Sequence, residues 1–144
     1  MAYEAAVLAA PRTFELRSIP EPEVAGDDVL IAVRAVNVCP TDIKKWKDDG
    51  LAEMLGRTPL ILGHEIAGEV VRVGPRADGI AIGDRVAVDP VIRNRDAAGN
   101  EVLAGIGSAA GAVDANALLL KERGIGGGFA EMVKVPAGNV IPIP

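Results

Sequence analysis

The chain has 144 residues, of which 49% are hydrophobic and 24% charged, and its formal net charge is −5 at pH 7. This length is typical of one domain with its own hydrophobic core, and the composition is that of a soluble globular protein. Negative charge without a basic stripe argues against nucleic-acid and anionic-membrane binding. No segment reaches membrane-spanning length. A single cysteine cannot form an internal disulfide, so we expect a reducing, cytoplasmic environment.

Alternating apolar and polar residues predict strands in the first part of the chain. Residues 3–9 and 13–20 are expected to form the first two strands, and residues 29–38 the longest one. Only four residues are aromatic, so valine, isoleucine, leucine and alanine must fill the core. The 17 glycines and 10 prolines favour short strands joined by turns.

A short helix is predicted directly after Cys39 and Pro40. Thr41 can cap it with its hydroxyl, and Asp42 favours the positive end of the helix dipole. The helix would then cover one or two turns up to Trp46. The following residues, 50–59, are expected to form a loop with one short helical piece.

The second half of the chain predicts further strands at residues 65–73, 85–88 and 129–135. The stretch from Asp89 to Gly128 is rich in alanine and glycine and has no sustained periodicity. We expect it to be irregular and mobile, with a brief helix over 115–123. The chain is therefore predicted to be mainly β, an irregular, partly open antiparallel barrel with one or two short helices.

Three residues could together hold a metal ion. Cys39 is the only cysteine, His64 is the only histidine, and Glu65 follows His64. A thiolate, an imidazole and a carboxylate are ligand types that zinc takes. The ordinary alternative is a buried small cysteine and an unrelated histidine. Because adjacent strand residues face opposite sides, His64 and Glu65 could share one ion only if the chain kinks, which Gly63 would permit.

Four motifs in this order resemble the zinc-containing alcohol and polyol dehydrogenases of the medium-chain superfamily: CPTD at 39–42 with Trp46, GHExxG at 63–68, GDRVAV at 83–88, and GGFAEMVKVP at 127–136. The resemblance covers nearly the whole chain. It implies that residues 1–144 form the N-terminal catalytic domain of that family, which has a GroES-like fold.

The nucleotide-binding Rossmann domain of this family normally follows a segment like NVIPIP, with which this sequence ends. No G-x-G-x-x-G motif is predicted between a strand and a helix, since Gly105, Gly107 and Gly111 lie in the stretch expected to be irregular. We therefore expect a catalytic domain without its cofactor domain, and no cofactor-binding residue in this chain.

The resemblance implies roles for individual residues. Cys39 and His64 would bind a catalytic zinc. Glu65 would be a third ligand, as in polyol-type members, or a neighbour, as in alcohol-type members, and the run Asp-Ile-Lys-Lys after Pro40 and Thr41 favours ligation.

Residues around these ligands have two interpretations each. The Thr41 hydroxyl would hand on the substrate proton, besides capping the helix. Asp42 would orient His64, or only stabilise the helix start. Trp46 would line a substrate pocket, or only cover the core.

The sequence departs from many family members at two places. Lys44 stands where many members carry the histidine that passes the proton to solvent, so that outer relay is not expected. The stretch VIRNRDAAGN after Pro90 contains no cysteine, whereas many members have a four-cysteine structural zinc lobe there. At most one zinc is therefore expected.

The implied activity is oxidation of an alcohol or polyol to a carbonyl, with hydride transfer to NAD(P) and zinc as Lewis acid. The isolated chain is expected to bind zinc without turnover, and a homo-oligomer is compatible with the sequence. Two alternatives remain: a non-enzymatic GroES-like binding or assembly module, and a zinc-free relative of the quinone-reductase type. Metal analysis of the purified chain would discriminate among them.

Overall fold

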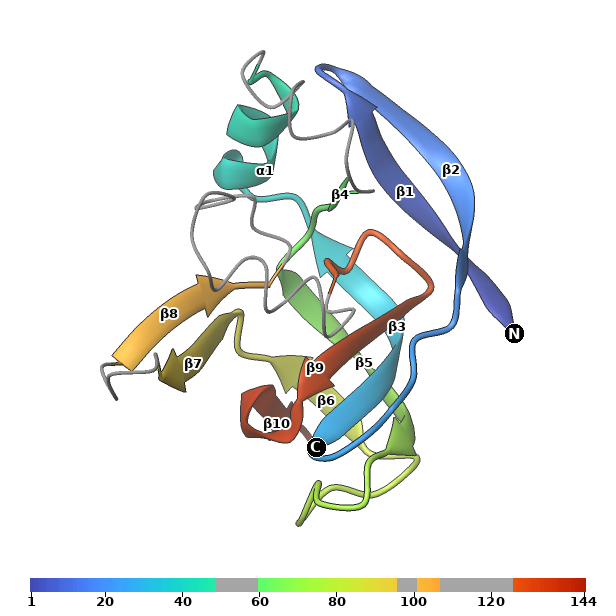
Figure 1. The fold of residues 1–144 in the computed structure, drawn as a ribbon, viewed down its shortest axis with the longest axis vertical. Helices are drawn as coiled ribbons and strands as arrows, with labels where there is room; N and C mark the ends of the chain where they lie inside the picture. The colour runs from blue at the N-terminus through green and yellow to red at the C-terminus, as the bar shows by residue number, and fades with distance from the viewer. Residues whose placement is uncertain (49–59, 96–100, 107–125) are drawn as a thin grey trace.

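The computed structural model describes residues 1–48, 60–95, 101–106 and 126–144. This part of the chain is mainly β, as predicted, and its α-helix is α1 at Pro40–Trp46 (Figure 1). The short helical pieces expected within 50–59 and over 115–123 lie outside the described residues. Among the described helices, none has the length and apolar character required to span a bilayer.

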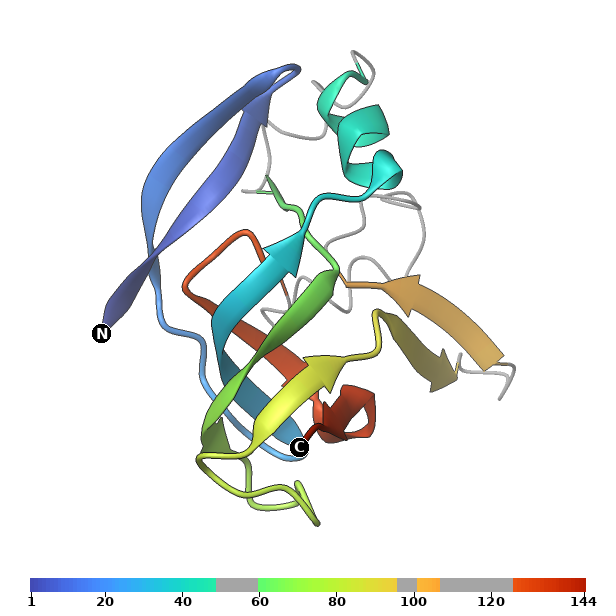
Figure 2. The same ribbon diagram turned by 180° about the vertical axis from the view of Figure 1, so that it is seen from behind.

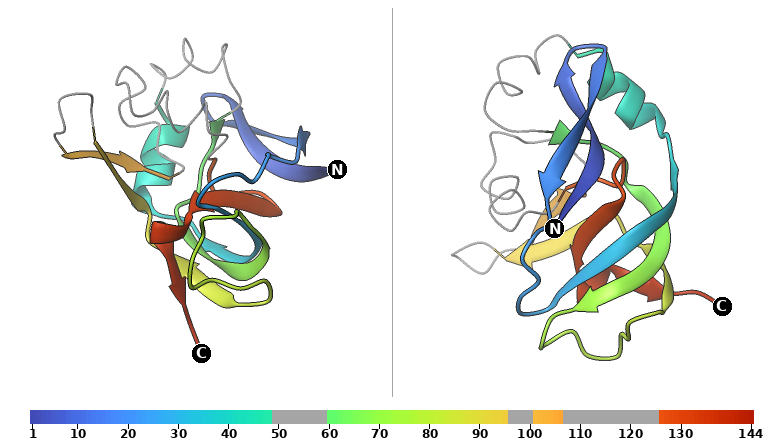
Figure 3. Two further views of the ribbon diagram at one scale, coloured as in Figure 1. Left: turned by 60° about the horizontal axis from the view of Figure 1, so that its bottom comes forward. Right: turned by 90° about the vertical axis from the view of Figure 1, so that its right-hand side faces the viewer.

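The larger sheet has five strands in the order β10-β6-β5-β3-β9, and every neighbouring pair is antiparallel. The sheet curls into an open half-barrel, as Figure 1 and Figure 3 show, which confirms the predicted GroES-like architecture. Its strands are β3 (Asp28–Asn37), β5 (Glu65–Val73), β6 (Arg85–Val88), β9 (Met132–Pro136) and β10 (Val140–Pro142).

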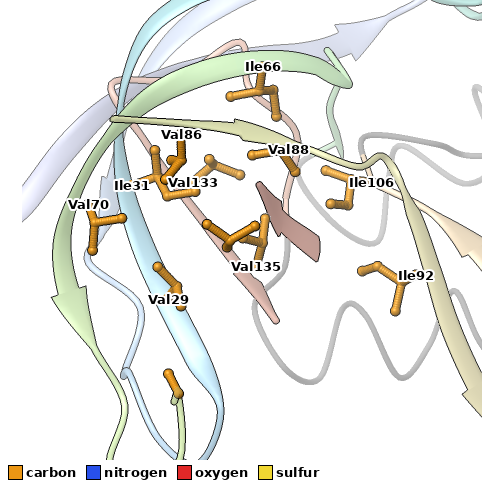
Figure 4. Close-up of a cluster of buried hydrophobic side chains, with 12 residues drawn as sticks. Val29, Ile31, Ile66, Val70, Val86, Val88, Ile92, Ile106, Val133 and Val135 are labelled. Carbon is orange, nitrogen blue, oxygen red and sulfur yellow. The ribbon is translucent and has the colours of Figure 1, made fainter. Parts of the chain in front are cut away.

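The concave side of this sheet holds the main hydrophobic core. Alternate residues of the strands point into it, as expected for a pleated sheet with one buried face. Figure 4 shows that the cluster consists of aliphatic side chains from several strands, including Val29, Ile31, Ile66, Val70 and Val86. In this core, β-branched side chains, which pack well on a pleated surface, take the place of aromatic residues.

Gly68 lies in the middle of β5, where the backbones of β3 and β5 approach closely. It pairs with Val33 next to an irregularity in the register of β3. A methyl group at position 68 would lie 2.2 Å from the carbonyl oxygen of Ala32. A side chain at this position would therefore push the two strands apart.

A second sheet stands beside the half-barrel, with the strand order β2-β1-β4 (Figure 2). It contains β1 (Ala2–Ala10), β2 (Thr13–Pro20) and the two-residue β4 (Leu60–Ile61). The central strand β1 is buried on both faces at Val7 and Leu8, which pack with two different hydrophobic clusters, whereas Ala2 and Glu4 near its start are exposed. Strand β2 forms the exposed edge of this sheet.

The stretch from Asp89 to Gly128 contains a hairpin that the sequence analysis did not predict. Strands β7 (Val91–Arg95) and β8 (Glu101–Gly105) pair antiparallel, so the expectation of an irregular stretch is wrong for these residues. Ile92 and Ile106 join the main core, which supplies the burial that holds the hairpin in place. Gly105 ends β8 instead of lying in a loop, and residues 96–100 and 107–125 lie outside the described part.

The last predicted strand, 129–135, begins later than expected. Strand β9 starts at Met132, and Phe129 packs against a small cluster around Leu8 and Leu62 instead. The preceding Gly127 approaches the Leu62 carbonyl so closely that a methyl group there would lie 2.1 Å from the oxygen. After β9, a 3₁₀ turn at Ala137–Asn139 leads into β10.

Candidate metal centre

The pairing of β3 with β5 brings the candidate ligands together. The two strands are antiparallel, and their last pair at this end joins Asn37 to Glu65. Cys39 follows the end of β3 by two residues, and His64 directly precedes β5. Because antiparallel strands place the end of one beside the start of the next, residues far apart in sequence meet at this edge.

The donor atoms of Cys39, His64 and Glu65 all lie within 4.8 Å of one another. Cys39 and His64 are half-buried, whereas Glu65 is exposed. Ligand atoms on a tetrahedral zinc lie about 3.3–3.8 Å apart, given bonds of about 2.0–2.3 Å. Small inward movements of these side chains would therefore close the set on one ion, and the thiolate, imidazole and carboxylate fit zinc chemically.

Gly63 provides the turn that lets neighbouring residues face the same point. Its φ of +89° lies in a region that side-chain-bearing residues rarely adopt. A methyl group at this position would also lie 2.6 Å from Cδ1 of Phe129. Because of the turn at Gly63, His64 lies before the regular strand β5, which begins at Glu65. The rule that adjacent strand residues face opposite sides therefore does not apply to this pair, and both side chains can point to one ion.

Helix α1 begins two residues earlier than the sequence analysis predicted, at Pro40 and not at Asp42. Its N-cap residue is Cys39, with Pro40 at the first helical position, so Thr41 is not the cap. A proline at this position has no N–H to leave unpaired and its φ suits the helix. Thr41 therefore lies inside the first turn, where its Oγ1 is 3.4 Å from Nε2 of His64.

Asp42 contacts His64 and the backbone of Cys39, and it is 3% exposed. Its Oδ2 accepts a hydrogen bond from the N–H of Cys39 at 2.9 Å, and its Oδ1 accepts one from the N–H of Gly63 at 3.2 Å. These partners compensate a buried carboxylate for its lost water. The one side chain thus connects the backbone at Cys39 with the backbone before His64.

Asp42 also faces the imidazole ring of His64, with 3.5 Å between Oδ1 and Nδ1. A carboxylate at this position favours a proton on Nδ1, which leaves the lone pair of Nε2 available to a metal or to the Thr41 hydroxyl. The orienting role of Asp42 stays a prediction, while its hydrogen bond to the N–H of Cys39 joins it to the N-cap of α1.

Two further residues of α1 lie close to these groups. Burial lowers the pKa of Lys45, and the nearby negative charge of Asp42 opposes this shift. Trp46 packs against the cluster of Leu8, Leu62, Leu60 and Phe129. Its indole therefore covers this part of the core, and its role in a substrate pocket stays a prediction.

An open pocket of about 390 Å³ adjoins His64 and Glu65. Three of its lining residues, Ala35, Ala67 and Ala87, are direct partners across β3, β5 and β6. Their small side chains leave room above the sheet, and Asn37 adds a polar group at the end near Glu65. The sequence analysis missed this pocket, because the three alanines align only once the strand register is known.

Residues 25–144 match the family of alcohol dehydrogenase GroES-like domains. The chain belongs to this family. It is 37% identical over 129 residues to an L-threonine 3-dehydrogenase of Ruegeria pomeroyi, covering 87% of this chain and 34% of that protein. It is 39% identical over 87 residues to a sorbitol dehydrogenase of Bacillus subtilis, covering 60% of this chain and 25% of that protein.

A solved structure similar to this GroES-like domain is that of a dehydrogenase of Sinorhizobium meliloti 1021 bound to NADP. The two superpose with a TM-score of 0.73 at 28% sequence identity, over 100% of this chain and 39% of the other. The chain thus spans about a third or less of the length of the curated relatives above.

In this GroES-like domain, five of the six predicted site residues lie together. Cys39, His64 and Glu65 form the candidate metal centre, and Thr41 and Asp42 contact His64. Trp46 belongs to the hydrophobic cluster on the side of α1 instead.

Proposed function

We propose that this chain is the zinc- and substrate-binding catalytic domain of an alcohol or polyol dehydrogenase. The observation that carries the proposal is the convergence of the Cys39, His64 and Glu65 donor atoms within 4.8 Å. Membership of the alcohol dehydrogenase GroES-like family supports it. So do the names of the curated relatives, which are threonine and sorbitol dehydrogenases.

We propose Cys39, His64 and Glu65 as the protein ligands of one catalytic zinc. The exposure of Glu65 leaves space at the centre for a water molecule or substrate oxygen, as a catalytic zinc site requires. A zinc ion held there would act as a Lewis acid, polarising an alcohol oxygen and lowering the pKa of its hydroxyl. No second zinc is proposed.

The remaining groups of the site position ligands and carry the proton. Asp42 holds the Nδ1 side of His64 and the backbone of Cys39, so both ligands are oriented before metal binds. The Thr41 hydroxyl beside His64 can accept a proton from a substrate hydroxyl while it donates its own. Thr41 and Asp42 are therefore proposed to act in proton transfer and positioning respectively.

The proposed substrate is a small alcohol or polyol. The pocket beside Glu65 is lined mostly by alanine, valine, isoleucine and proline, with Asn37 as a polar uncharged side chain. Apolar walls with few polar groups suit a small organic molecule that is oriented by one or two hydrogen bonds. We also propose that Trp46 contacts substrates that are long enough to extend towards α1.

The proposed hydride acceptor is NAD(P). The alcohol gives a hydride to NAD(P) and releases one proton, which leaves the carbonyl product. The NADP bound in the similar Sinorhizobium structure supports this choice. No residue of the candidate metal centre is assigned to the coenzyme. The single cysteine supports a reducing compartment, and we propose the cytoplasm.

Metal analysis of the purified chain tests the proposal. About one zinc per chain, lost on chelation and restored on readdition, is expected of a site with three protein ligands and one open position. A chain without bound zinc that also fails to take up added zinc would favour a binding module or a zinc-free relative instead. With the protein at its full natural length, chelation should abolish alcohol-dependent reduction of NAD(P), and zinc should restore it.

A further inference from the structure

The free edge of strand β2 (Thr13–Pro20) fits a second copy of itself. We propose that two copies of this chain pair through β2, antiparallel and about a two-fold axis at Leu16. This proposal is independent of the dehydrogenase function. In the part of the chain that the structure describes, β2 pairs only with β1, and the hairpin stands at the periphery of the molecule (Figures 1 and 2).

The pairing of β1 shows which backbone groups β2 presents at its edge. On β1, the N–H of Ala6 donates to the Phe129 carbonyl, and the carbonyl of Glu4 accepts from the N–H of Glu131. Ala6 and Glu4 therefore turn their backbone groups away from β2. Their partners on β2 are Leu16 and Ser18.

In an antiparallel pair, two opposite residues both turn towards each other or both turn away. Leu16 and Ser18 consequently direct their N–H and C=O groups outwards, and so does Phe14 by the alternation of the strand. An antiparallel partner centred on Leu16 would pair Leu16 with Leu16, and Phe14 with Ser18, in hydrogen-bonded positions. Strand β2 thus offers a self-complementary set of donors and acceptors.

The charges of β2 select this register. Glu15 and Arg17 lie on the same face and form an ion pair at 2.7 Å, with side chains 51% and 45% exposed. Pairing centred on Leu16 places Glu15 of each copy opposite Arg17 of the other, in the positions where cross-strand side chains lie closest. A two-fold axis at Glu15 would place the two Glu15 side chains opposite each other, and an axis at Arg17 would do the same with the two Arg17 side chains. Both arrangements are unfavourable because like charges face each other.

The apolar side chains of β2 give the pairing a second source of stability. Leu16 is 75% exposed and Phe14 is 41% exposed. Both lie on the face opposite to Glu15 and Arg17. In the paired register the two Leu16 side chains come together across the axis and remove apolar surface from water. A strand edge of this length with an exposed leucine is otherwise a template for unspecific association.

Cysteine cross-linking tests both the partner and the register. Only position 16 lies opposite itself, at a Cα separation of about 5.5 Å, which a disulfide can bridge. Under mild oxidation, Leu16→Cys should form a disulfide-linked dimer. Glu15→Cys alone and Arg17→Cys alone should form no disulfide-linked dimer. An equal mixture of the two variants should cross-link, because position 15 of one copy lies opposite position 17 of the other. The unsubstituted chain controls for Cys39, and circular dichroism checks that each variant is folded.

Charge reversal gives an independent test by sedimentation of the folded chain at several concentrations. We expect a concentration-dependent dimer whose dissociation constant rises about tenfold in Glu15→Arg or Arg17→Glu, equivalent to about 1.4 kcal/mol. The double variant should recover the original affinity, because it exchanges the two partners. A monomer at all concentrations, a dimer insensitive to these charges, or cross-linking of Leu16→Cys no faster than that of Glu15→Cys would overturn the proposal.

Discussion

The carboxylate of Asp42 accepts a hydrogen bond from the backbone N–H of Gly63 at 3.2 Å. Its other oxygen accepts one from the N–H of Cys39 at 2.9 Å. One buried side chain therefore joins the segment after β3 to the segment before β5. These are the two segments that carry the candidate ligands, so the geometry of the site depends on Asp42 whether or not a metal is bound.

Replacement of Asp42 should destabilise the domain. Asp42→Ala leaves two N–H groups without their acceptor, and we expect the free energy of unfolding to fall by about 2–5 kcal/mol. Asp42→Asn keeps one oxygen, so its loss should be smaller. Urea denaturation measures both variants. The control is Asp84→Ala, which removes a half-buried carboxylate that accepts from the N–H of the exposed Ala81 at 2.8 Å. A loss in Asp42→Ala no larger than in this control would contradict the account.

Gly63 should tolerate no side chain, for two separable reasons. Gly63→Ala combines an unfavourable φ of +89° with a methyl group 2.6 Å from Cδ1 of Phe129. Gly83 has a φ of +93°, and no atom lies within 4 Å of the place that a methyl group would take there, so Gly83→Ala reports the backbone strain alone. We expect about 1–2 kcal/mol of destabilisation in the control and about 1–3 kcal/mol more in Gly63→Ala. Thermal unfolding of both variants gives the difference, and equal losses would show that Phe129 moves aside freely.

The strands that the sequence predicts best are those with regular alternation. Residues 13–20, 65–73 and 85–88 match β2, β5 and β6, because one periodicity decides each of them. The hairpin of β7 and β8 was missed because charged residues interrupt the pattern after Ile92, and only the burial of Ile92 and Ile106 in a distant core reveals its place. Such long-range packing overrides local pattern.

The candidate site could be predicted as a set of residues, but its arrangement could not. Residue types identified Cys39, His64 and Glu65, and the glycine before His64 indicated the turn. The start of α1 was misplaced because Thr41 is a good cap by composition, whereas Pro40 is the stronger signal for the first helical position. The linking role of Asp42 with Gly63 requires the register of β3 and β5, which alternation alone does not give.

Substitution of the candidate ligands should remove zinc selectively. Cys39→Ala and His64→Ala are expected to lose stoichiometric zinc, because two protein ligands hold the ion poorly. Glu65→Gln should weaken zinc binding about 10-fold or more if the carboxylate is a ligand or orients one. Competition with a zinc-binding dye measures the affinities. Glu69→Gln is the matched control, since Glu69 lies on the same strand and pairs with Arg34 instead; its affinity should be unchanged. Zinc retained by Cys39→Ala or His64→Ala would remove that residue from the site.

The turn between β1 and β2 anchors the far end of α1. Arg12 has a φ of +61°, and its N–H donates to the Trp46 carbonyl at 2.7 Å. Arg12→Gly keeps this hydrogen bond and relieves the backbone, whereas Arg12→Ala keeps the strain. We expect Arg12→Gly to be more stable than Arg12→Ala by about 1 kcal/mol in urea unfolding. The reverse order would show that the positive φ is not a source of strain here.

The most direct test of the metal centre is a crystal structure of the zinc-loaded chain with anomalous scattering at the zinc edge. The account predicts one strong peak about 2.3 Å from Sγ of Cys39 and about 2.0–2.1 Å from a ring nitrogen of His64. It also predicts a Glu65 oxygen within about 2.2 Å, whereas a separation beyond about 4 Å would make Glu65 a neighbour of the ligands. A peak located away from Cys39 and His64 would contradict the proposed function at its centre.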